Sequence, residues 1–114
     1  MAFGTRVVFE PLRSVAFGGV NAAYTAVGTA TTDHSRLISI FNSTDTDILL
    51  SLDGSTDHMR IASGTGQVLD LSTNKIRDDG LFLAQGTIFY IKRAAGAPST
   101  GNVWIQVMAA AGGV

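Results

Sequence analysis

The sequence predicts an all-β protein built as a single antiparallel β-sandwich, jelly-roll-like in type. Short runs rich in isoleucine, valine, leucine and aromatic residues recur about every 10 to 15 residues, and turn-forming residues separate them. No stretch of the sequence carries apolar residues at the i, i+3, i+4, i+7 spacing of a capped amphipathic helix. The only helical turn that we expect lies within 72–77.

The two ends of the chain differ from its middle. We expect 1–20 to form an extended N-terminal arm or an edge strand, because Pro11 interrupts its apolar residues and proline is confined to sheet edges. The sandwich domain is expected over 21–108. The alanine- and glycine-rich end, 109–114, is expected to be a short flexible C-terminal tail.

The clearest local signal in the middle of the chain is a β-hairpin. Ile48, Leu50 and Leu52 alternate with Leu49 and Ser51, as in a strand with one buried face. Asp53 and Gly54 follow at once, and an Asp-Gly pair favours a type I′ turn, in which both central residues have a positive φ. The return strand is expected over 57–61.

The other strands are expected in short apolar runs bounded by glycine, proline or polar turn residues. These runs are 37–41, 67–71, 81–83, 87–92 and 103–108. In the last run, valine and isoleucine alternate with Trp104, Gln106 and Met108, so the two sets lie on opposite faces of the strand. We expect the valines and the isoleucine in the core. That leaves Trp104 in a second buried layer or at an interface.

The chain carries few charges for its length. Eight basic and nine acidic residues make 17 charged residues out of 114, or 15%, compared with roughly 25% in ordinary soluble domains. A lone domain normally keeps its surface soluble with mixed charges, so we expect neighbouring subunits to cover part of this one. The net charge of −1 gives no reason to expect nucleic acid or a membrane as a partner.

The sequence contains no convincing catalytic or metal-binding pattern, so we expect neither an enzyme nor a cofactor. The chain has no cysteine, which excludes disulfides and thiolate metal sites. Its densest polar cluster is Asp53, Asp57 and His58, which fits a hairpin turn better than a cation site. In a strand, Asp57 and His58 would point to opposite faces. The loop 63–66 lacks the lysine and the helix of a phosphate-binding loop.

Several strand-and-turn stretches, spread over about two thirds of the chain, carry a resemblance to a known class of proteins. They are RLISIFNSTD (36–45), SLDGSTDH (51–58), VLDLSTNK (68–75), GTIFYIK (86–92) and PSTGNV (98–103). In this pattern the chain resembles small structural proteins of tailed-bacteriophage virions. The resemblance implies a non-enzymatic β-sandwich that acts in many copies on a particle assembled in the host cytoplasm.

Composition and resemblance together predict a capsid cement or decoration protein. Such a protein would be a homo-oligomer that also contacts other virion proteins, such as the major capsid protein. A ring component of the neck, adaptor or tail is the alternative, and a carbohydrate-binding module using Trp104 and Tyr90 is a more distant one. The expected interface residues come from the arm and the last strand. They are Arg6, Val7, Phe9, Leu12, Arg13, Phe17, Trp104 and Met108.

Overall fold

The computed structural model describes residues 5–32, 35–70 and 84–113. Within these ranges the chain is all-β, with nine strands and a three-residue 3-10 turn, η1 (Phe17–Gly19). The strands are β1 (Thr5–Phe9), β2 (Arg13–Ala16), β3 (Thr25–Ala26), β4 (Ser35–Asn42), β5 (Ile48–Ser51), β6 (Met59–Ile61), β7 (Thr65–Asp70), β8 (Tyr90–Arg93) and β9 (Asn102–Gly113). The expected helical turn at 72–77 and the expected strand at 81–83 lie outside the described residues.

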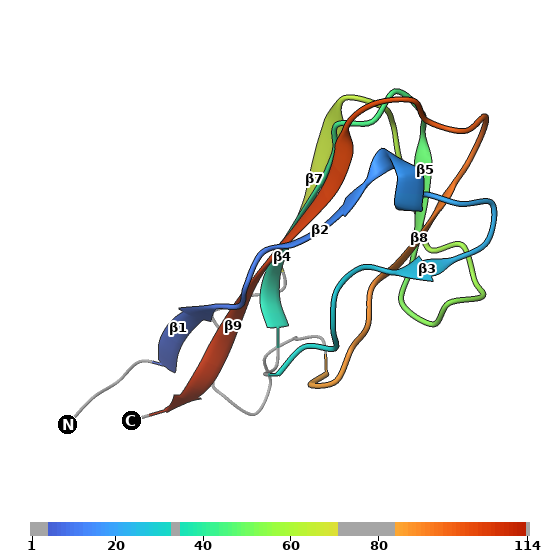
Figure 1. Ribbon diagram of the computed structural model, residues 1–114. Coiled ribbons are helices and arrows are strands. Elements are labelled where there is room, and N and C mark those ends of the chain that lie inside the picture. The colour runs from blue at the N-terminus through green and yellow to red at the C-terminus, as the bar shows by residue number, and fades with distance from the viewer. Residues whose placement is uncertain (1–4, 33–34, 71–83, 114) are drawn as a thin grey trace.

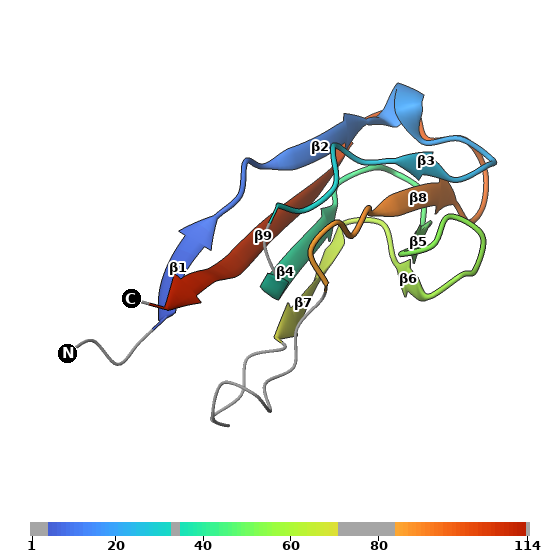
Figure 2. The same ribbon diagram turned by 90° about the horizontal axis from the view of Figure 1, so that it is seen from below.

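The strands form two antiparallel sheets in a sandwich-like arrangement (Figure 1). Sheet A has the order β1-β9-β4-β7, and β2 also pairs with β9, while sheet B has the order β3-β8-β5-β6. Figure 2 shows the strands of sheet A on one side of the molecule and those of sheet B on the other. Most consecutive strands belong to different sheets, so the chain passes repeatedly from one sheet to the other.

The core lies between the two sheets and is built mainly by alternation along β4, β5, β8 and β9. Its fully buried side chains include Ile38, Ile40, Ile48, Leu50, Ile61, Phe89, Ile91, Val103, Ile105 and Val107. Burying one such side chain contributes about 1.5–3 kcal/mol, so this set is the main source of stability. The prediction that the valines and the isoleucine of the last strand face the core is confirmed.

The predicted hairpin is present, but its turn differs from the prediction. β5 pairs with β6, and no described residue other than glycine has a positive φ, so Asp53 cannot be part of a type I′ turn. Instead the Asp53 carboxylate accepts hydrogen bonds from the backbone N–H groups of Ser55 and Thr56, both at 2.8 Å. The side chain therefore organises a wider loop, and the return strand begins at Met59.

The first and the last described strands both lie in sheet A. β1 pairs with the last part of β9, and β2 pairs with its first part, with Pro11 in the break between them. Where the sequence predicts a flexible tail, β9 continues to Gly113, because pairing with β1 satisfies its backbone hydrogen-bonding groups. Figure 1 shows β1 and the end of β9 extending from the sandwich as a two-stranded ribbon.

Candidate interaction surface

The outer surface of sheet A, turned away from sheet B, gathers apolar side chains from four strands. The pairing register places Phe41 opposite Trp104, and Leu37 opposite Met108, which also lies opposite Phe9. On the far strand, β7, Val68 lies opposite Ser39. We call Phe9, Leu37, Phe41, Val68, Trp104 and Met108 the apolar face of sheet A.

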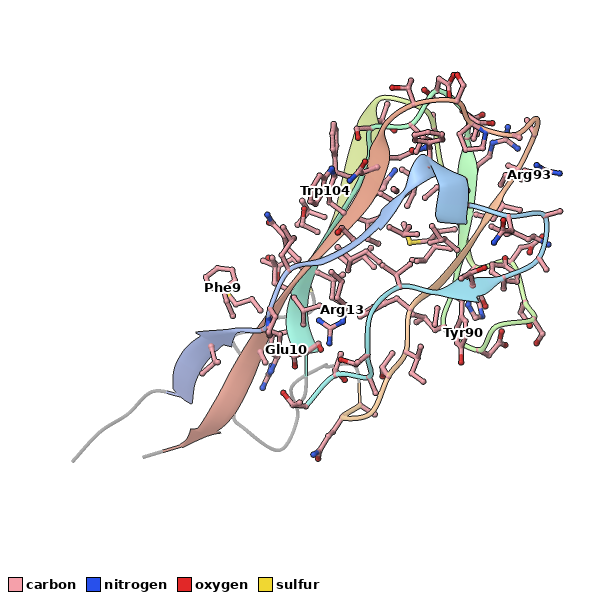
Figure 3. All side chains as sticks on the ribbon, viewed as in Figure 1. Phe9, Glu10, Arg13, Tyr90, Arg93 and Trp104 are labelled. Carbon is pink, nitrogen blue, oxygen red and sulfur yellow. The ribbon has the colours of Figure 1, made fainter. Side chains whose placement is uncertain are left out.

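This face is uncovered by any other strand of the described structure. Phe9 is 69% exposed, Val68 62% and Phe41 44%, while the other three members are partly exposed. The second buried layer that the sequence allowed for Trp104 is not found among the described residues, and Figure 3 shows this side chain on the outside of the sheet. Large apolar side chains grouped on one surface are typical of interaction sites.

The apolar face is also nearly free of charge. Among the residues that the register pairs on it, Asp70 is the charged one, and it lies at the end of the edge strand. The charged Arg36 lies next to Leu37 in the bulge of β4, where the register shifts between Ser35 and Leu37. The polar residues between the apolar ones are neutral, namely Ser14, Ser39 and Gln106. Depletion of charge at the centre, with aromatic residues and methionine enriched, is the composition of a protein–protein interface core.

The outer surface of sheet B is built differently, from charged and hydroxyl groups that contact one another. Lys92 Nζ lies 3.3 Å from Asp57 Oδ1 and 4.7 Å from the centre of the Tyr24 ring. The Tyr24 hydroxyl donates a hydrogen bond to Asp57 at 2.5 Å. Burial and this hydrogen bond raise the pKa of Tyr24 to about 12, and the Tyr24 and Lys92 contacts lower the pKa of Asp57.

A second ion pair follows on the same side of the molecule. Arg60 Nη2 lies 2.7 Å from Asp47 Oδ2, and Asp47 also accepts a hydrogen bond from the Ser63 N–H at 2.9 Å. The hydrogen bond from Ser63 and the one from Arg60 lower the pKa of the Asp47 carboxyl. The charges of this surface are thus used within the molecule.

The polar cluster singled out in the sequence belongs to the hairpin loop. The Leu52 N–H donates to His58 Nδ1 at 3.0 Å, while His58 Nε2 lies 4.0 Å from Asp53 Oδ2. Hydrogen bonds from the N–H groups of Thr56 and Ser55 hold the pKa of Asp53 well below its usual range. Within 5–32, 35–70 and 84–113, no group of three or more His, Asp or Glu residues is arranged to hold a metal ion.

The structure describes the side chains of six of the eight expected interface residues and places them in three kinds of environment. Phe9, Trp104 and Met108 belong to the apolar face, and Leu12 and Phe17 are exposed outside it, at 52% and 41%. Arg6 and Val7 lie on β1, and their side chains are outside the described part of the structure. The remaining residue, Arg13, is the exception.

Arg13 is turned into the molecule and offers nothing to a partner. Only 6% of it is exposed, and its Nη2 lies 2.7 Å from Glu10 Oε1 in a buried ion pair. Its Nε donates to the Thr29 carbonyl at 3.0 Å, and its guanidinium lies 5.8 Å from the centre of the Phe89 ring. β2 places Arg13 opposite the core residue Ile105, which explains why it faces inward (Figure 3).

Three members of the apolar face were not expected from the sequence. Leu37 and Phe41 alternate with the buried Ile38 and Ile40, just as Trp104 alternates with its core neighbours. The same alternation rule applied to β4 identifies both residues. Val68 is exposed because it lies on the outer face of β7, an edge strand, and the sequence does not reveal this position.

The two aromatic residues considered for a sugar-binding platform are far apart. Trp104 lies on the outer face of sheet A, whereas Tyr90 belongs to β8 in sheet B, beside the hairpin loop (Figure 3). A planar platform needs its aromatic rings on one surface, so these two residues do not form one together.

The structure therefore defines an all-β protein of two antiparallel sheets, with one apolar and one charged outer surface. Comparison with family models, with curated proteins and with solved structures found no match to this chain. A search of the described residues found no helix long and apolar enough to cross a membrane.

Proposed function

We propose that the protein is a non-enzymatic structural subunit of a tailed-bacteriophage virion, and specifically a cement or decoration protein of the head. The observation that carries the proposal is the apolar face of sheet A, an exposed and nearly uncharged surface on a chain with few charges overall. An exposed apolar surface of this kind is typical of a site that another protein covers. The strand-and-turn resemblance of 36–108 to small virion proteins supplies the kind of assembly.

The strand order supports a finer assignment of the fold as a jelly roll. Among the eight strands from β2 to β9, the first pairs with the eighth, the eighth with the third and the third with the sixth in sheet A. Sheet B joins the second, seventh, fourth and fifth. This is the order of two interlocked Greek keys, an architecture common in viral capsid proteins and also in lectins. Because one fold hosts many functions, the surface carries the argument and the topology supports it.

A subunit of this kind would stabilise the capsid because the same apolar contact is repeated by many copies on one particle. An aromatic side chain such as Trp104 or Phe41 that moves from water into a pocket of the particle stabilises the contact by about 1.5–3 kcal/mol when it becomes fully buried. Two or more linked subunits that bind at once multiply the effect through their effective concentration. Many copies would then hold neighbouring capsid subunits together without any chemical reaction.

The experiment is to determine where the chain lies on purified phage particles and how many copies each particle carries. Quantitative mass spectrometry should find copies on the order of hundreds, the number that a symmetric shell requires, and labelled antibodies should decorate the head. A copy number equal to a small ring symmetry, with label at the neck or tail, would favour the ring component instead. Absence of the chain from the particle would refute the virion assignment.

A further inference from the structure

β7 is an open edge strand. It pairs with β4 along its whole length, and no described strand lies on its other side. Five of its six residues are exposed, among them Val68 at 62%. Its sequence, TGQVLD, contains no proline and no lysine, and its only charge is on the last residue, Asp70.

The other sheet edges carry the protection that β7 lacks. In sheet B the edge strands are very short, with two residues in β3 and three in β6. The opposite edge of sheet A is broken between β1 and β2 at Pro11, and its register shifts between Thr5 and Arg6. Short strands, proline and bulges are the usual means of preventing edge-to-edge pairing. β7 is thus the edge of the described structure that remains suited to pairing.

We propose that a second copy of this chain pairs with β7, so that two β7 strands run antiparallel about a twofold axis at Val68. The two copies of sheet A would then form one continuous sheet. This inference deepens the proposed function, on which it rests for its biological meaning, by naming the homo-oligomer contact.

The strand is complementary to its own copy in this arrangement. Residues directly opposite in an antiparallel pair point to the same face, with Cβ atoms about 4.5–5.5 Å apart. The axis therefore brings the two exposed Val68 side chains into contact and places each Asp70 opposite a glycine, Gly66 of the other copy. The two carboxylates lie about 14 Å apart along the strands, beyond the screening length of about 8 Å at physiological salt. No like charges oppose each other.

The pairing also extends the surface that the proposed function uses. Because opposite residues share a face, the apolar faces of both copies lie on the same side of the joined sheet. That surface stays free to contact the particle, while the edge is used between copies. A pair of subunits would then attach through two linked contacts, which raises avidity.

The absence of cysteine allows a clean cross-linking test. In Val68→Cys, edge pairing places the two sulfur-bearing residues within disulfide range, since Cα separations of about 4.4–6.8 Å permit the bond. Gln106→Cys is the matched control, because Gln106 is exposed on the same face and in the same row, two strands further in. Under mild oxidation Val68→Cys should become mostly a disulfide-linked dimer, and Gln106→Cys should remain uncross-linked. Equal cross-linking of both variants, or none in Val68→Cys, overturns the proposal.

Sedimentation of cysteine-free protein gives an independent readout. The unmodified chain should be a dimer, and Val68→Lys, which places a charge on the edge, should raise the dimer dissociation constant by at least about tenfold. Gln106→Lys adds the same charge away from the edge and should remain dimeric. A monomeric unmodified chain, or a dimer unaffected by Val68→Lys, contradicts the proposed contact. Because neither assay uses particles, failure here is distinguishable from failure of the virion assignment.

Discussion

The outer surfaces of the two sheets are made from opposite chemistry. Sheet A presents phenylalanine, tryptophan, methionine, leucine and valine with neutral polar residues between them, and sheet B presents Lys92, Arg60 and their carboxylate partners. The first surface leaves large apolar groups uncovered, whereas the second pairs its charges internally. Among the described residues, the apolar outer surface is therefore the outer surface of sheet A, and that surface is the one equipped to meet a partner.

Many of the charges that the chain retains serve its own fold. Glu10 and Arg13 form a buried pair, and Asp45 accepts hydrogen bonds from the Ser99 N–H and hydroxyl at 2.8 and 2.6 Å. Asp53 organises the hairpin loop in the same way. Near the apolar face, the charged side chains of Glu10 and Arg13 are turned inward, so neither adds a charge to that face.

The largest effect is expected from breaking the buried ion pair between Glu10 and Arg13, beside the apolar face. Glu10→Ala should lower the free energy of unfolding by about 3–5 kcal/mol, because it leaves the Arg13 guanidinium buried without its carboxylate. Urea unfolding followed by circular dichroism measures it. The double variant Glu10→Ala with Arg13→Met should recover much of the loss. A loss below about 1 kcal/mol, the range of an exposed ion pair, would show that the pair is not a buried structural element.

The second-largest effect is expected on attachment to the particle, and it should differ between the outer surfaces of the two sheets. Trp104→Ala removes the largest side chain of the apolar face and should weaken attachment to the particle by about 30-fold or more, the loss typical of an interface tryptophan. Leu49→Ala is the matched control, since Leu49 lies on the outer surface of sheet B, opposite Lys92 and Arg60. It should leave attachment unchanged. Equal losses in both variants would remove the distinction between the surfaces.

Acid should affect stability more than attachment. The carboxyl pKa values of Asp45, Asp47, Asp53 and Asp57 are all lowered in the folded protein. Their contribution to stability is therefore present above the unfolded value of about 3.9 and is lost as the pH falls through the lower folded values. Thermal unfolding from neutral pH to pH about 2 should show this loss.

At the alkaline end, Tyr24 acts with the opposite sign. Its raised pKa contributes stability that is present below pH about 10, the unfolded pKa, and is lost as the pH rises through the folded pKa of about 12.

Attachment through the nearly neutral apolar face should change little with salt. Strong weakening of attachment by salt would point to a charged contact instead.

The smallest expected effect concerns the charged surface alone. Lys92→Ala removes a partly exposed ion pair with Asp57 and the contact with the Tyr24 ring, and exposed pairs contribute little. The melting temperature should fall by at most a few degrees, and attachment should not change. A large loss of attachment in this variant would move the interaction surface to sheet B.

The pattern of apolar and polar residues in the sequence predicted where individual strands lie and which of their side chains face the core. It identified the strands around Ile40, Leu50 and Ile105, and it placed Trp104 away from the core. It could not determine the hairpin turn, because the Asp53 side chain rather than a positive φ shapes that loop. Nor could it predict the inward position of Arg13, which depends on the Thr29 carbonyl 16 residues away as well as on Glu10.

The candidate surface was predictable only in part for a similar reason. Trp104, Met108 and Phe9 were expected at an interface, but the face exists as a unit because β9 pairs with both β1 and β4. Such long-range pairing joins residues about a hundred positions apart. The exposure of Val68 likewise depends on the place of β7 at the edge of sheet A.

Hydroxyl-radical footprinting of the unmodified chain, free and on the assembled particle, tests the central claim most directly. Phe41, Trp104 and Met108 on the apolar face should be oxidised in the free subunit and strongly protected on the particle. Tyr24 and Tyr90, which belong to the sheet B side, should react equally in both states. Protection of the two tyrosines with continued oxidation of Trp104 would contradict the account, because it would place the partner on the charged side.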